Sequence, residues 1–584
     1  MKSHVYVLGT GLSHDGSACL LRDGSIAVAV EKERITRRKH DGGNDNAAIQ
    51  YCLDAEGIEL SDVALVVQNE NFGMFHGGNT WYGEAPRIIA DHPRVVSVSH
   101  HLAHAYSAFY ASPFDEAAVM VIDGCGNSLA DTMDPGSPEL PPDIAAVPPD
   151  LAHLYNEKDS YYVFKDDGNG PAANKSSCSA LYKDYSVWGH RARGVVIHPS
   201  TTMHSIGGLY SAVSSYVFGG MEDPGKLMGL APYGRPDVFS FEMFELREGR
   251  VFVRYDWMKD FDWPTRGPRA FVDNFKFFAN LAWHTQREVE RALLYVLNAR
   301  FERFPADNLA YAGGVALNAV ANRRIVRETR YRNIFFQPAA GDNGLALGCA
   351  YYGHREILRE KRVKSSGSSC FGRSYPDIEM RTAIEGAAKT GGVDAYEAVA
   401  SEDILARTAD ALAAGKTVAW FQGGSEFGPR ALGHRSILAD PRVPEMRDHI
   451  NANIKFREDF RPFAPSVRRE DVDTYFECDD ESPYMILVAP TREEWKERIP
   501  SVVHRDGSAR IQTVTAASDP MYYALLAAFR ERSGVGILLN TSFNRKGMPI
   551  VETPQQAVEF FLSCALDVLV LGRYFVEKAT SPKA

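Results

Sequence analysis

The chain has 584 residues, more than a single hydrophobic core normally organises, so two domains are expected. Apolar residues make up 45% of it and charged residues 24%, which is typical of a soluble globular protein. The formal net charge of -11 at pH 7 argues against a dedicated nucleic-acid-binding protein, because such proteins usually carry a basic excess. A local group of arginines can still hold a phosphorylated small molecule in an acidic protein.

The eight cysteines are scattered and include no C-x-x-C pair. This spacing is typical of reduced thiols rather than of a disulfide framework or a zinc site. No stretch approaches the ~20 consecutive apolar residues that a membrane span needs. The first residues also lack the apolar core of a signal peptide. We therefore expect a cytoplasmic protein with neither a membrane nor a nucleic acid as partner.

The first predicted elements are three short strands. Residues 5–8 form an apolar run that leads into a glycine loop at 9–11, and a second strand follows at 17–21. An Asp23-Gly24 turn then precedes a third strand at 26–30.

Two later strands also run into glycines. Residues 119–122 precede Asp123 and Gly124, and residues 309–312 precede Gly313 and Gly314. Strands that end in glycine loops, with helical stretches between them, predict an α/β fold that binds its ligand at the strand ends. Two related phosphate loops and a later nucleoside loop match the duplicated plan of actin/hexokinase-type ATPases.

Residues 131–200 are first rich in proline and then polar. They predict an irregular excursion over the surface, which is either a lid or acceptor-side insertion or a disordered loop without consequence. Residues 359–372 are charged and then rich in serine and glycine, as linkers often are. A second domain should therefore run from about residue 373, with a helix near 404–414 and a strand at 417–421.

A pair of histidines is the first candidate for chemistry. On a helix, His100 and His104 lie one turn apart on one face, so that two imidazoles can share a metal ion. Satisfied core histidines are the alternative interpretation. Asp123 and Asp342, each in a predicted loop, would complete a site of nitrogen and oxygen ligands, although Asp342 could simply cap a helix.

Lys226 lies among glycines in the run DPGKLMGLAPYG at 223–234. Glycines allow close approach of the backbone and a lysine suits a phosphate, but the order is not that of a Walker A loop. A structural turn with an exposed lysine is the alternative.

Basic residues collect in the last third of the chain, where a phosphate dianion would find both guanidinium and neutral donors. A solvated basic face is the alternative. The residues are the run EFGPRALGHRS at 426–436, Lys455, Arg457, Arg461, Arg510 and the run NTSFN at 540–544.

Eight motifs in this order resemble one known family. They are HHLAHA (100–105), DPGKLMGLAPYG (223–234), AGGVALN (312–318), GDNG (341–344), EFGPRALGHRSIL (426–438), MRDHIN (446–451), RPFAPS (461–466) and LNTSFN (539–544). Together they resemble the O-carbamoyltransferase family of nodulation protein U and of the cephem, aminoglycoside and ansamycin carbamoyltransferases. The resemblance covers nearly the whole chain, except that 131–200 looks longer than its equivalent in compact members.

The resemblance implies a Kae/TsaD-like, actin-type ATPase domain at 1–358, with an insertion at about 131–200, and a YrdC-like α/β domain at 373–584. It implies that a divalent metal, Fe(II), Mn(II) or Mg(II), binds His100, His104, Asp123 and Asp342. ATP would bind at Asp123, Gly124, Lys226, Gly229, Gly313, Gly314 and Asn318. Carbamoyl phosphate would bind at Arg430, Lys455, Arg461, Arg510, Asn540 and Ser542. The residues implied in catalysis are His14, Lys39, Glu222 and Asp223.

The implied reaction is the transfer of a carbamoyl group to a hydroxyl of a natural-product, antibiotic-like alcohol. Carbamoyl phosphate and ATP would first give carbamoyl adenylate, and His14 would then act as the base for the acceptor hydroxyl. The alternative is a tRNA threonylcarbamoyl-transfer enzyme built from the same modules. The sequence leaves open which alcohol is the acceptor, and it leaves open the oligomeric state, a homodimer included.

Overall fold

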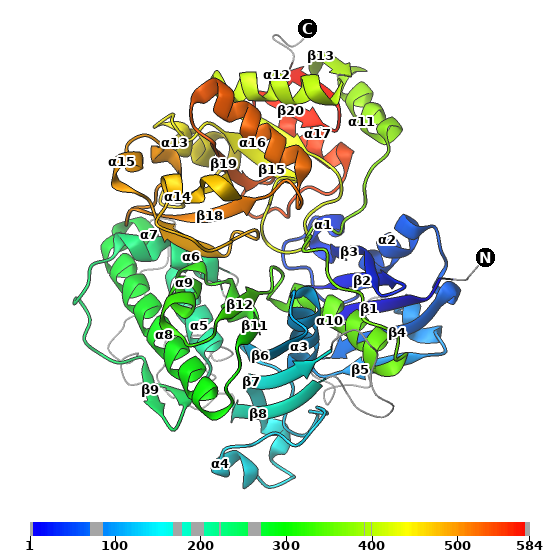
Figure 1. Ribbon diagram of the computed structural model, residues 1–584, viewed down its shortest axis with the longest axis vertical. Helices are drawn as coiled ribbons and strands as arrows, with labels where there is room; N and C mark the ends of the chain where they lie inside the picture. Colours follow the sequence, from blue (N-terminus) through cyan, green and yellow to red (C-terminus); the bar gives the residue numbers. More distant parts are fainter. Residues whose placement is uncertain are drawn as a thin grey trace. The chain divides into compact units, whose positions relative to one another are not determined.

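A computed structural model describes the chain at residues 4–70, 86–166, 178–187, 204–220, 223–254, 270–389, 392–398 and 400–578. The chain divides into two compact units (Figure 1). The first comprises Met1–Glu33 and His40–Gly367, and the second comprises Arg34–Lys39 and Ser368–Ala584. The change between Gly367 and Ser368 falls inside the predicted linker. No helix of the described residues combines the length and the hydropathy that crossing a membrane requires.

The first unit contains two five-stranded sheets of the same design. In each, three antiparallel strands come first in the chain, and two further strands are added in parallel beside the first strand of the three. The first sheet has the order β3 (Ser25–Glu31), β2 (Ser17–Arg22), β1 (Tyr6–Leu12), β4 (Val63–Glu70), β5 (Val95–Val98). The second has the order β12 (Asn333–Phe336), β11 (Asn308–Ala312), β6 (Glu116–Ile122), β7 (Tyr155–Lys165), β8 (Cys178–Val187). The predicted α/β class and its duplication are therefore confirmed.

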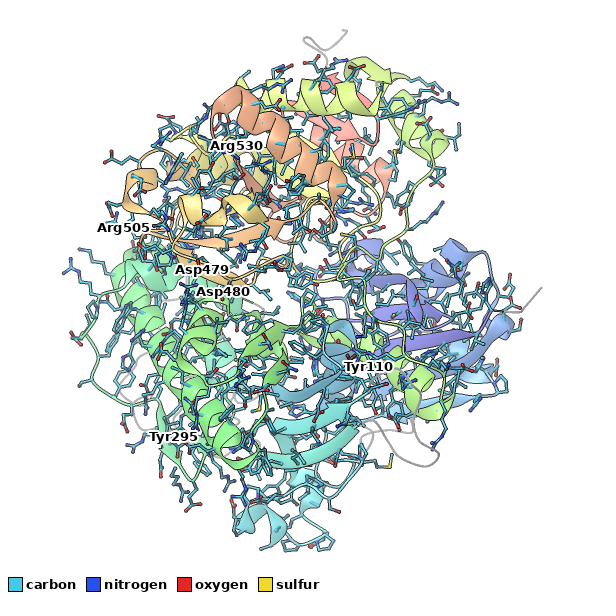
Figure 2. The ribbon with its side chains drawn as sticks, in the orientation of Figure 1. Tyr110, Tyr295, Asp479, Asp480, Arg505 and Arg530 are labelled. Atoms are coloured by element: carbon cyan, nitrogen blue, oxygen red, sulfur yellow. The ribbon has the colours of Figure 1, made fainter. Side chains whose placement is uncertain are left out.

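Two helices, α3 (His100–Ala111) and α10 (Leu345–Tyr352), pack against each other beside these sheets. Helix α10 contacts β1, β2 and β4 of the first sheet, and α3 contacts β6, β7 and β11 of the second sheet as well as β4 of the first. Both helices are almost entirely buried. Tyr110 at the end of α3, labelled in Figure 2, donates its hydroxyl hydrogen to Asp166 Oδ2 over 2.8 Å. Helix α3 carries the predicted ligands His100 and His104, and the predicted ligand Asp342 lies in the turn directly before α10.

The predicted glycine loop at 9–11 is wrong, because these residues lie within β1. Helix α10 packs so closely on the strand that a Cβ atom on Gly9 would lie 2.1 Å from the Ala346 carbonyl oxygen and 2.5 Å from the Ala350 nitrogen. Gly9 therefore permits helix-to-strand packing, and the true β1–β2 loop lies at 13–16.

Gly9→Ala should consequently destabilise the first unit by ~1–3 kcal/mol or more, because the atoms it meets belong to the backbone and cannot rotate away. Urea denaturation measures the loss. Gly225→Ala is the matched control, since a Cβ atom there meets nothing within 4 Å. Equal stability of the two variants would contradict the packing described.

The prediction of an irregular excursion at 131–200 is wrong for 155–165 and 178–187, which form the long strands β7 and β8. The two strands lack the alternation of apolar and polar residues that predicts a strand, because several of their buried residues are charged. These residues are Glu157, Lys158, Asp159, Lys183 and Asp184. They are paired inside the sheet: Lys183 contacts Glu157, and Lys158 Nζ lies 2.9 Å from Asp184 Oδ2. Residues 167–177 and 188–200 of the same stretch lie outside the described residues.

The stability of the first unit should also depend on pH through His204. Burial, reinforced by the charge of Lys158, lowers the pKa of His204 to about 4, and its Nδ1 accepts a hydrogen bond of 2.9 Å from the Val253 amide. Because the unfolded chain binds this proton at about pH 6.5, the stabilisation is present above that pH and is lost as the pH falls toward 4.

Between pH 6.5 and 5 we expect His204 to account for a loss of roughly 1–2 kcal/mol, allowing for its partial exposure. Urea denaturation at both pH values, with His204→Asn for comparison, checks this. If the free energy of unfolding of the variant changes with pH as steeply as that of the wild type, the pH dependence comes from other groups.

The second unit is built on one sheet of nine strands. Its order is β13 (Val393–Ala398), β21 (Tyr574–Lys578), β20 (Val568–Leu571), β14 (Val418–Phe421), β15 (Arg435–Ala439), β19 (Ile537–Ser542), β16 (Ala464–Arg468), β18 (Ser508–Val514), β17 (Leu487–Pro490). In β14, Val418 and Trp420 belong to the hydrophobic core under α12 (Ser401–Ala413) and α16 (Pro520–Ser533). Ala419 and Phe421 belong to the core that contains α11 (Asp377–Lys389) and α17 (Pro554–Leu562). The alternation shows a sheet that is buried on both faces.

The segment Arg34–Lys39 completes the second unit. Arg34 is buried and donates to the Gly428 carbonyl over 2.7 Å, and Arg37 donates to the carbonyls of Pro549 and Ile550 over 2.8 and 2.7 Å. These hydrogen bonds explain why six residues from the start of the chain group with its last third. The predicted YrdC-like fold of this unit stays a prediction.

Candidate active site

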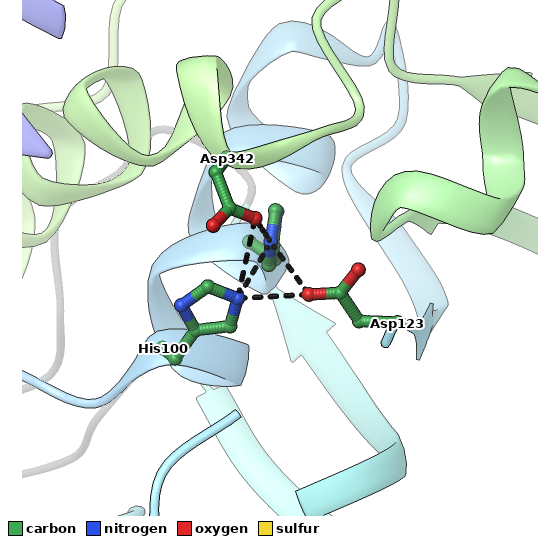
Figure 3. Close-up of side chains that lie close together, drawn as sticks. His100, Asp123 and Asp342 are labelled. Atoms are coloured by element: carbon green, nitrogen blue, oxygen red, sulfur yellow. Dashed lines mark hydrogen bonds and ion pairs between the residues drawn. The ribbon is translucent and has the colours of Figure 1, made fainter. Parts of the chain in front are cut away.

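Four predicted metal ligands come together in the first unit. Strand β5 leads into α3, which carries His100 at its start and His104 one turn later, and β6 ends directly before Asp123. Asp342 begins the short turn η9 (Asp342–Gly344) that leads into α10. Figure 3 shows His100, Asp123 and Asp342 pointing toward one another.

The ligand atoms of the four residues lie within 4.8 Å of one another. His100 Nε2 lies 2.9 Å from Asp123 Oδ2, 3.5 Å from Asp342 Oδ1 and 3.2 Å from His104 Nε2. His104 Nε2 lies 3.7 Å from Asp123 Oδ2 and 3.6 Å from Asp342 Oδ1. All four side chains are buried, so their polar atoms have little water to satisfy them.

The charges in this cluster are strongly coupled to one another. Burial disfavours a charged imidazole at His104, but the hydrogen bonds to Asp123 and Asp342 outweigh it and raise the pKa to about 9. Burial also raises the pKa of the Asp123 carboxyl, yet the hydrogen bonds from His100 and His104 hold it well below its usual range. The pKa of Asp342 is lowered despite its burial, chiefly by the charges of His100 and His14.

These residues fit a divalent metal. Two imidazole nitrogens that face each other at 3.2 Å, with two carboxylate oxygens beside them, are a donor set for Fe(II), Mn(II) or Mg(II). The backbone around them is also held in place. The His100 amide donates to Asn127 Oδ1 over 2.7 Å, and the Asn127 amide donates to Glu157 Oε2 over 2.9 Å. The buried ion pairs of β7 and β8 thus reach the cluster through Glu157.

His14 lies beside the cluster, in the β1–β2 loop. Its Nδ1 is 3.2 Å from Asp342 Oδ2 and its Nε2 is 3.5 Å from Asp15 Oδ2. The side chain is 57% exposed, so a substrate can reach it. The structure thus brings the predicted base to the predicted metal ligands.

Three of the predicted nucleotide-binding glycines surround Asp123. The Gly314 amide donates to Asp123 Oδ1 over 3.0 Å. Gly313 has φ of 89°, and a Cβ atom on it would lie 2.2 Å from the Ile122 carbonyl oxygen. Gly124 meets the start of α5 (Ile206–Phe218), where a Cβ atom on Gly207 would lie 2.8 Å from its nitrogen. The backbone therefore packs closely around Asp123, with no room for a side chain at Gly313 or Gly207.

The other predicted nucleotide ligands have contacts of their own. Lys226, on α6 (Pro224–Leu230), lies with its Nζ 2.7 Å from Asp223 Oδ1. Asn318 caps α9 (Ala319–Glu328) by accepting from the Ala321 amide, and it exchanges hydrogen bonds with Gln286. Of the remaining predicted residues, Gly229 lies within α6, Glu222 lies outside the described residues, and Lys39 groups with the second unit.

Five cations lie close together in the second unit: Arg430, Lys455, Arg457, Arg461 and Arg510. Burial lowers the pKa of Arg430 to about 10, with a further contribution from the charge of Arg461. Burial and the neighbouring guanidinium groups hold the pKa values of Lys455, Arg457 and Arg510 well below their usual ranges. We refer to these five residues as the cation cluster.

Lys455, Arg457 and Arg510 of the cation cluster contact neutral atoms. Lys455 Nζ donates to the Ser542 carbonyl, Ser542 Oγ and Asn544 Oδ1 over 2.5, 3.1 and 2.7 Å. Within the described ranges, no carboxylate lies within 4 Å of Arg430, Lys455, Arg457 or Arg510 to form an ion pair. The Nε atoms of Arg430 and Arg510 are buried without a hydrogen-bond partner among the described residues. Buried positive charge of this kind favours an anionic ligand.

Asn540 and Ser542 differ in their surroundings. Ser542 accepts from Lys455, whereas the amide group of Asn540 donates to Ser466 Oγ, Gln512 Oε1 and the Ala431 carbonyl. Asn540 thereby holds the loop that carries Arg430.

The predicted carbamoyl-phosphate set did not include Arg457. Its side chain is held by Asn451 Oδ1 over 2.7 Å and lies over the Phe463 ring. The sequence had already placed Arg457 among the basic residues that suit a phosphate, two residues after Lys455. The intervening Phe456 has φ of 48°, and Met485, whose Sδ is 3.7 Å from Arg510 Nη2, has φ of 58°. Such strained non-glycine residues concentrate at functional sites.

Comparison with known proteins decides the family. Residues 7–77 and 64–351 match the family described as Carbamoyltransferase N-terminus, and residues 409–578 match Carbamoyltransferase C-terminus. The chain belongs to the carbamoyltransferase family. It is an enzyme that transfers carbamoyl groups.

Relatives of this carbamoyltransferase come from several organisms. It is 33% identical to an uncharacterized protein of Synechocystis, over 99% of this chain and 97% of the relative. It is 34% identical to nodulation protein NolNO of Sinorhizobium fredii, over 97% of this chain and 79% of the relative. A third relative is the 3'-hydroxymethylcephem-O-carbamoyltransferase of Streptomyces clavuligerus, 35% identical over 47% of this chain and 49% of the relative.

Proposed function

We propose that this carbamoyltransferase uses ATP and carbamoyl phosphate to carbamoylate a hydroxyl group of a small natural-product alcohol. The observation that carries the proposal is the cation cluster, which gathers five cations in a chain whose net charge is -11. A phosphate dianion bound there would replace mutual repulsion by charge-assisted hydrogen bonds. The cephem relative, named for a hydroxymethyl acceptor, supports an alcohol as the second substrate.

In the proposed reaction, carbamoyl phosphate and water give carbamate and phosphate at the cation cluster. In the first unit, a carbamate oxygen then attacks the α-phosphorus of ATP, pyrophosphate leaves, and carbamoyl adenylate forms. The acceptor oxygen finally attacks the carbamoyl carbon and AMP leaves with the bonding electrons. Adenylation supplies the good leaving group that a weakly nucleophilic alcohol requires.

Different residues of the first unit would bind the metal, bind the nucleotide and accept the proton. His100, His104, Asp123 and Asp342 would hold a divalent metal, which supplies Lewis-acid stabilisation of phosphate charge when bound. The loop at Gly313 and Gly314, where the backbone lies open to a close approach, and the side chain of Lys226 would bind the nucleotide. His14 would accept the proton of the acceptor hydroxyl, with Asp15 and Asp342 orienting its ring. Lys39 and Asp223, and Glu222 outside the described residues, remain proposed catalytic residues.

The experiment that tests this proposal is mass spectrometry of products after incubation with ATP, carbamoyl phosphate and a panel of natural-product alcohols. We expect one alcohol to gain a carbamoyl group, with AMP and pyrophosphate formed in equal amounts. Transfer that proceeds equally well without ATP, or that yields ADP, would contradict the adenylate route. AMP release that depends on tRNA instead would favour the threonylcarbamoyl alternative.

A further inference from the structure

A buried network of charged side chains ends at the start of α3, the helix that carries His100 and His104. Lys183 on β8 lies at its centre, where its ammonium group contacts the carboxylates of Glu157 on β7 and of Asp134. All three side chains are at most 2% exposed, so water cannot replace these contacts. The mechanism proposed above assigns none of the three residues a role.

The first branch of the network runs through Glu157 and ends at the backbone of His100. Glu157 Oε2 accepts from the Asn127 amide over 2.9 Å, and Asn127 Oδ1 accepts from the His100 amide over 2.7 Å. Gly126 leaves room for this carboxylate, because a Cβ atom on it would lie 2.5 Å from Glu157 Oε2. The first amide of a helix has no acceptor within the helix, so the bond to Asn127 fixes where α3 begins. We refer to this route as the Glu157 branch.

The second branch runs through Asp134 and ends at Ser99, the residue before α3. The side chain of Ser99 does not cap its own helix; its Oγ instead donates to Asp134 Oδ1 over 3.0 Å. The Tyr162 hydroxyl donates to the other carboxylate oxygen, Asp134 Oδ2, over 3.3 Å. Negative charge near the start of a helix is stabilised by the helix dipole. We refer to this route as the Asp134 branch.

The charge of Lys183 keeps both branches in place. Burial disfavours a charged ammonium group, but the carboxylate of Glu157 and the other negative groups around it outweigh burial and hold the pKa of Lys183 well above its usual range. Without this cation, two buried carboxylates would repel each other and would have to move or take up protons. Loss of Lys183 would therefore disturb both attachments of α3 at once.

We infer that Lys183 is a positioning residue of the metal site, which acts on α3 through the Glu157 and Asp134 branches. The inference rests on the metal of the proposed function. His100 Nε2 lies 2.9 Å from Asp123 Oδ2 and 3.2 Å from His104 Nε2, so a small rotation of the start of α3 would take a ligand atom out of the set. Groups that orient metal ligands typically contribute ~10–100-fold to metal affinity.

The affinity of the metal-free full chain for Mn²⁺, without nucleotide or substrate, tests the inference. Free Mn²⁺ is followed through its electron paramagnetic resonance signal. Lys183→Met should weaken binding ~10–100-fold. Asn127→Ala and Ser99→Ala each break one branch but keep the ion pairs, and each should weaken binding by part of that factor. Because the branches belong to one network, adding Lys183→Met to the double variant Asn127→Ala, Ser99→Ala should weaken binding little further.

Lys158→Met is the matched control. Lys158 lies on β7 next to Glu157, is equally buried, and has its Nζ 2.9 Å from Asp184 Oδ2 on β8. Its Nζ donates over 2.8 Å to the Val251 carbonyl of β10 (Arg250–Val253), so its side chain ties the sheet to β10. The variant should lose stability in urea, as Lys183→Met does, and keep the Mn²⁺ affinity of the wild type.

Three results would overturn the inference alone. The first is wild-type Mn²⁺ affinity in a folded Lys183→Met protein. The second, which decides the matter if Lys183→Met does not fold, is wild-type affinity in both Asn127→Ala and Ser99→Ala. The third is an equal loss of affinity in Lys158→Met, which would show that affinity follows stability. A wild type that binds no Mn²⁺ would overturn the metal of the proposed function and the inference with it, so the two failures are distinguishable.

Discussion

Replacing His104 by alanine is expected to abolish carbamoyl adenylate formation while phosphate release from carbamoyl phosphate continues. His104 belongs to the buried cluster of the first unit, and the cation cluster that would bind carbamoyl phosphate belongs to the second. A bound metal contributes several kcal/mol of charge stabilisation, so its loss should lower adenylate formation by at least ~10²-fold. Pyrophosphate release measures adenylate formation, and phosphate release measures the breakdown of carbamoyl phosphate. The two are measured separately.

Two further variants distinguish the loss of a metal ligand from a loss of folding. Asp342→Asn keeps the size of a ligand side chain and should show the same division, whereas His153→Ala, at an exposed position of the first unit, should change neither activity. Equal loss of both activities in a folded His104→Ala protein would assign the metal a different role.

Arg510→Ala is expected to lower the use of carbamoyl phosphate by at least ~10-fold. Each charge-assisted hydrogen bond to the phosphate is worth roughly 1.5–3 kcal/mol, and a guanidinium group supplies one or two of them. Arg430→Ala should behave alike, and the double variant should lose less than the product of the two effects, because both residues hold one dianion. The specificity constant for carbamoyl phosphate, followed through phosphate release, measures these losses.

Arg505→Ala is the matched control for Arg510→Ala. Arg505 lies five residues earlier, is exposed and is labelled in Figure 2, so its loss should leave carbamoyl phosphate use unchanged. Equal effects of the two variants would show that the overall charge of this region, rather than the cation cluster, attracts the substrate.

The sequence singled out four residues that the structure brings together, because the signals of these residues are local. His100 and His104 are one helical turn apart, and Asp123 and Asp342 follow or precede regular elements. That all four converge is a property of how α3 packs on α10, which no spacing reveals. The prediction from the sequence was wrong where charged residues are buried. Glu157 and Lys183 have the side chains of surface residues, although they form an ion pair inside a sheet.

Glycine was the other source of error. Gly9 and Gly313 both follow apolar runs, yet only Gly313 lies beyond its strand with a positive φ, while Gly9 accommodates a helix from more than three hundred residues later. Arg457 was counted among the basic residues that suit a phosphate, but it was not included in the carbamoyl-phosphate set that the resemblance implies. The left-handed conformation at Phe456 governs the course of the chain between Lys455 and Arg457, and an aromatic residue does not signal it.

The most direct test of the division of labour supplies preformed carbamoyl adenylate to the Arg461→Ala variant together with an acceptor alcohol. Arg461 belongs to the cation cluster, and the adenylate enters the proposed reaction after the step at that cluster. The variant should therefore fail with carbamoyl phosphate and ATP, yet carbamoylate the alcohol from the adenylate at a rate near that of the wild type. His14→Asn should remain slow by ~10²–10⁴-fold with either donor, since it would lack the general base. A folded Arg461→Ala protein that stays inactive with the adenylate would contradict the two-site mechanism.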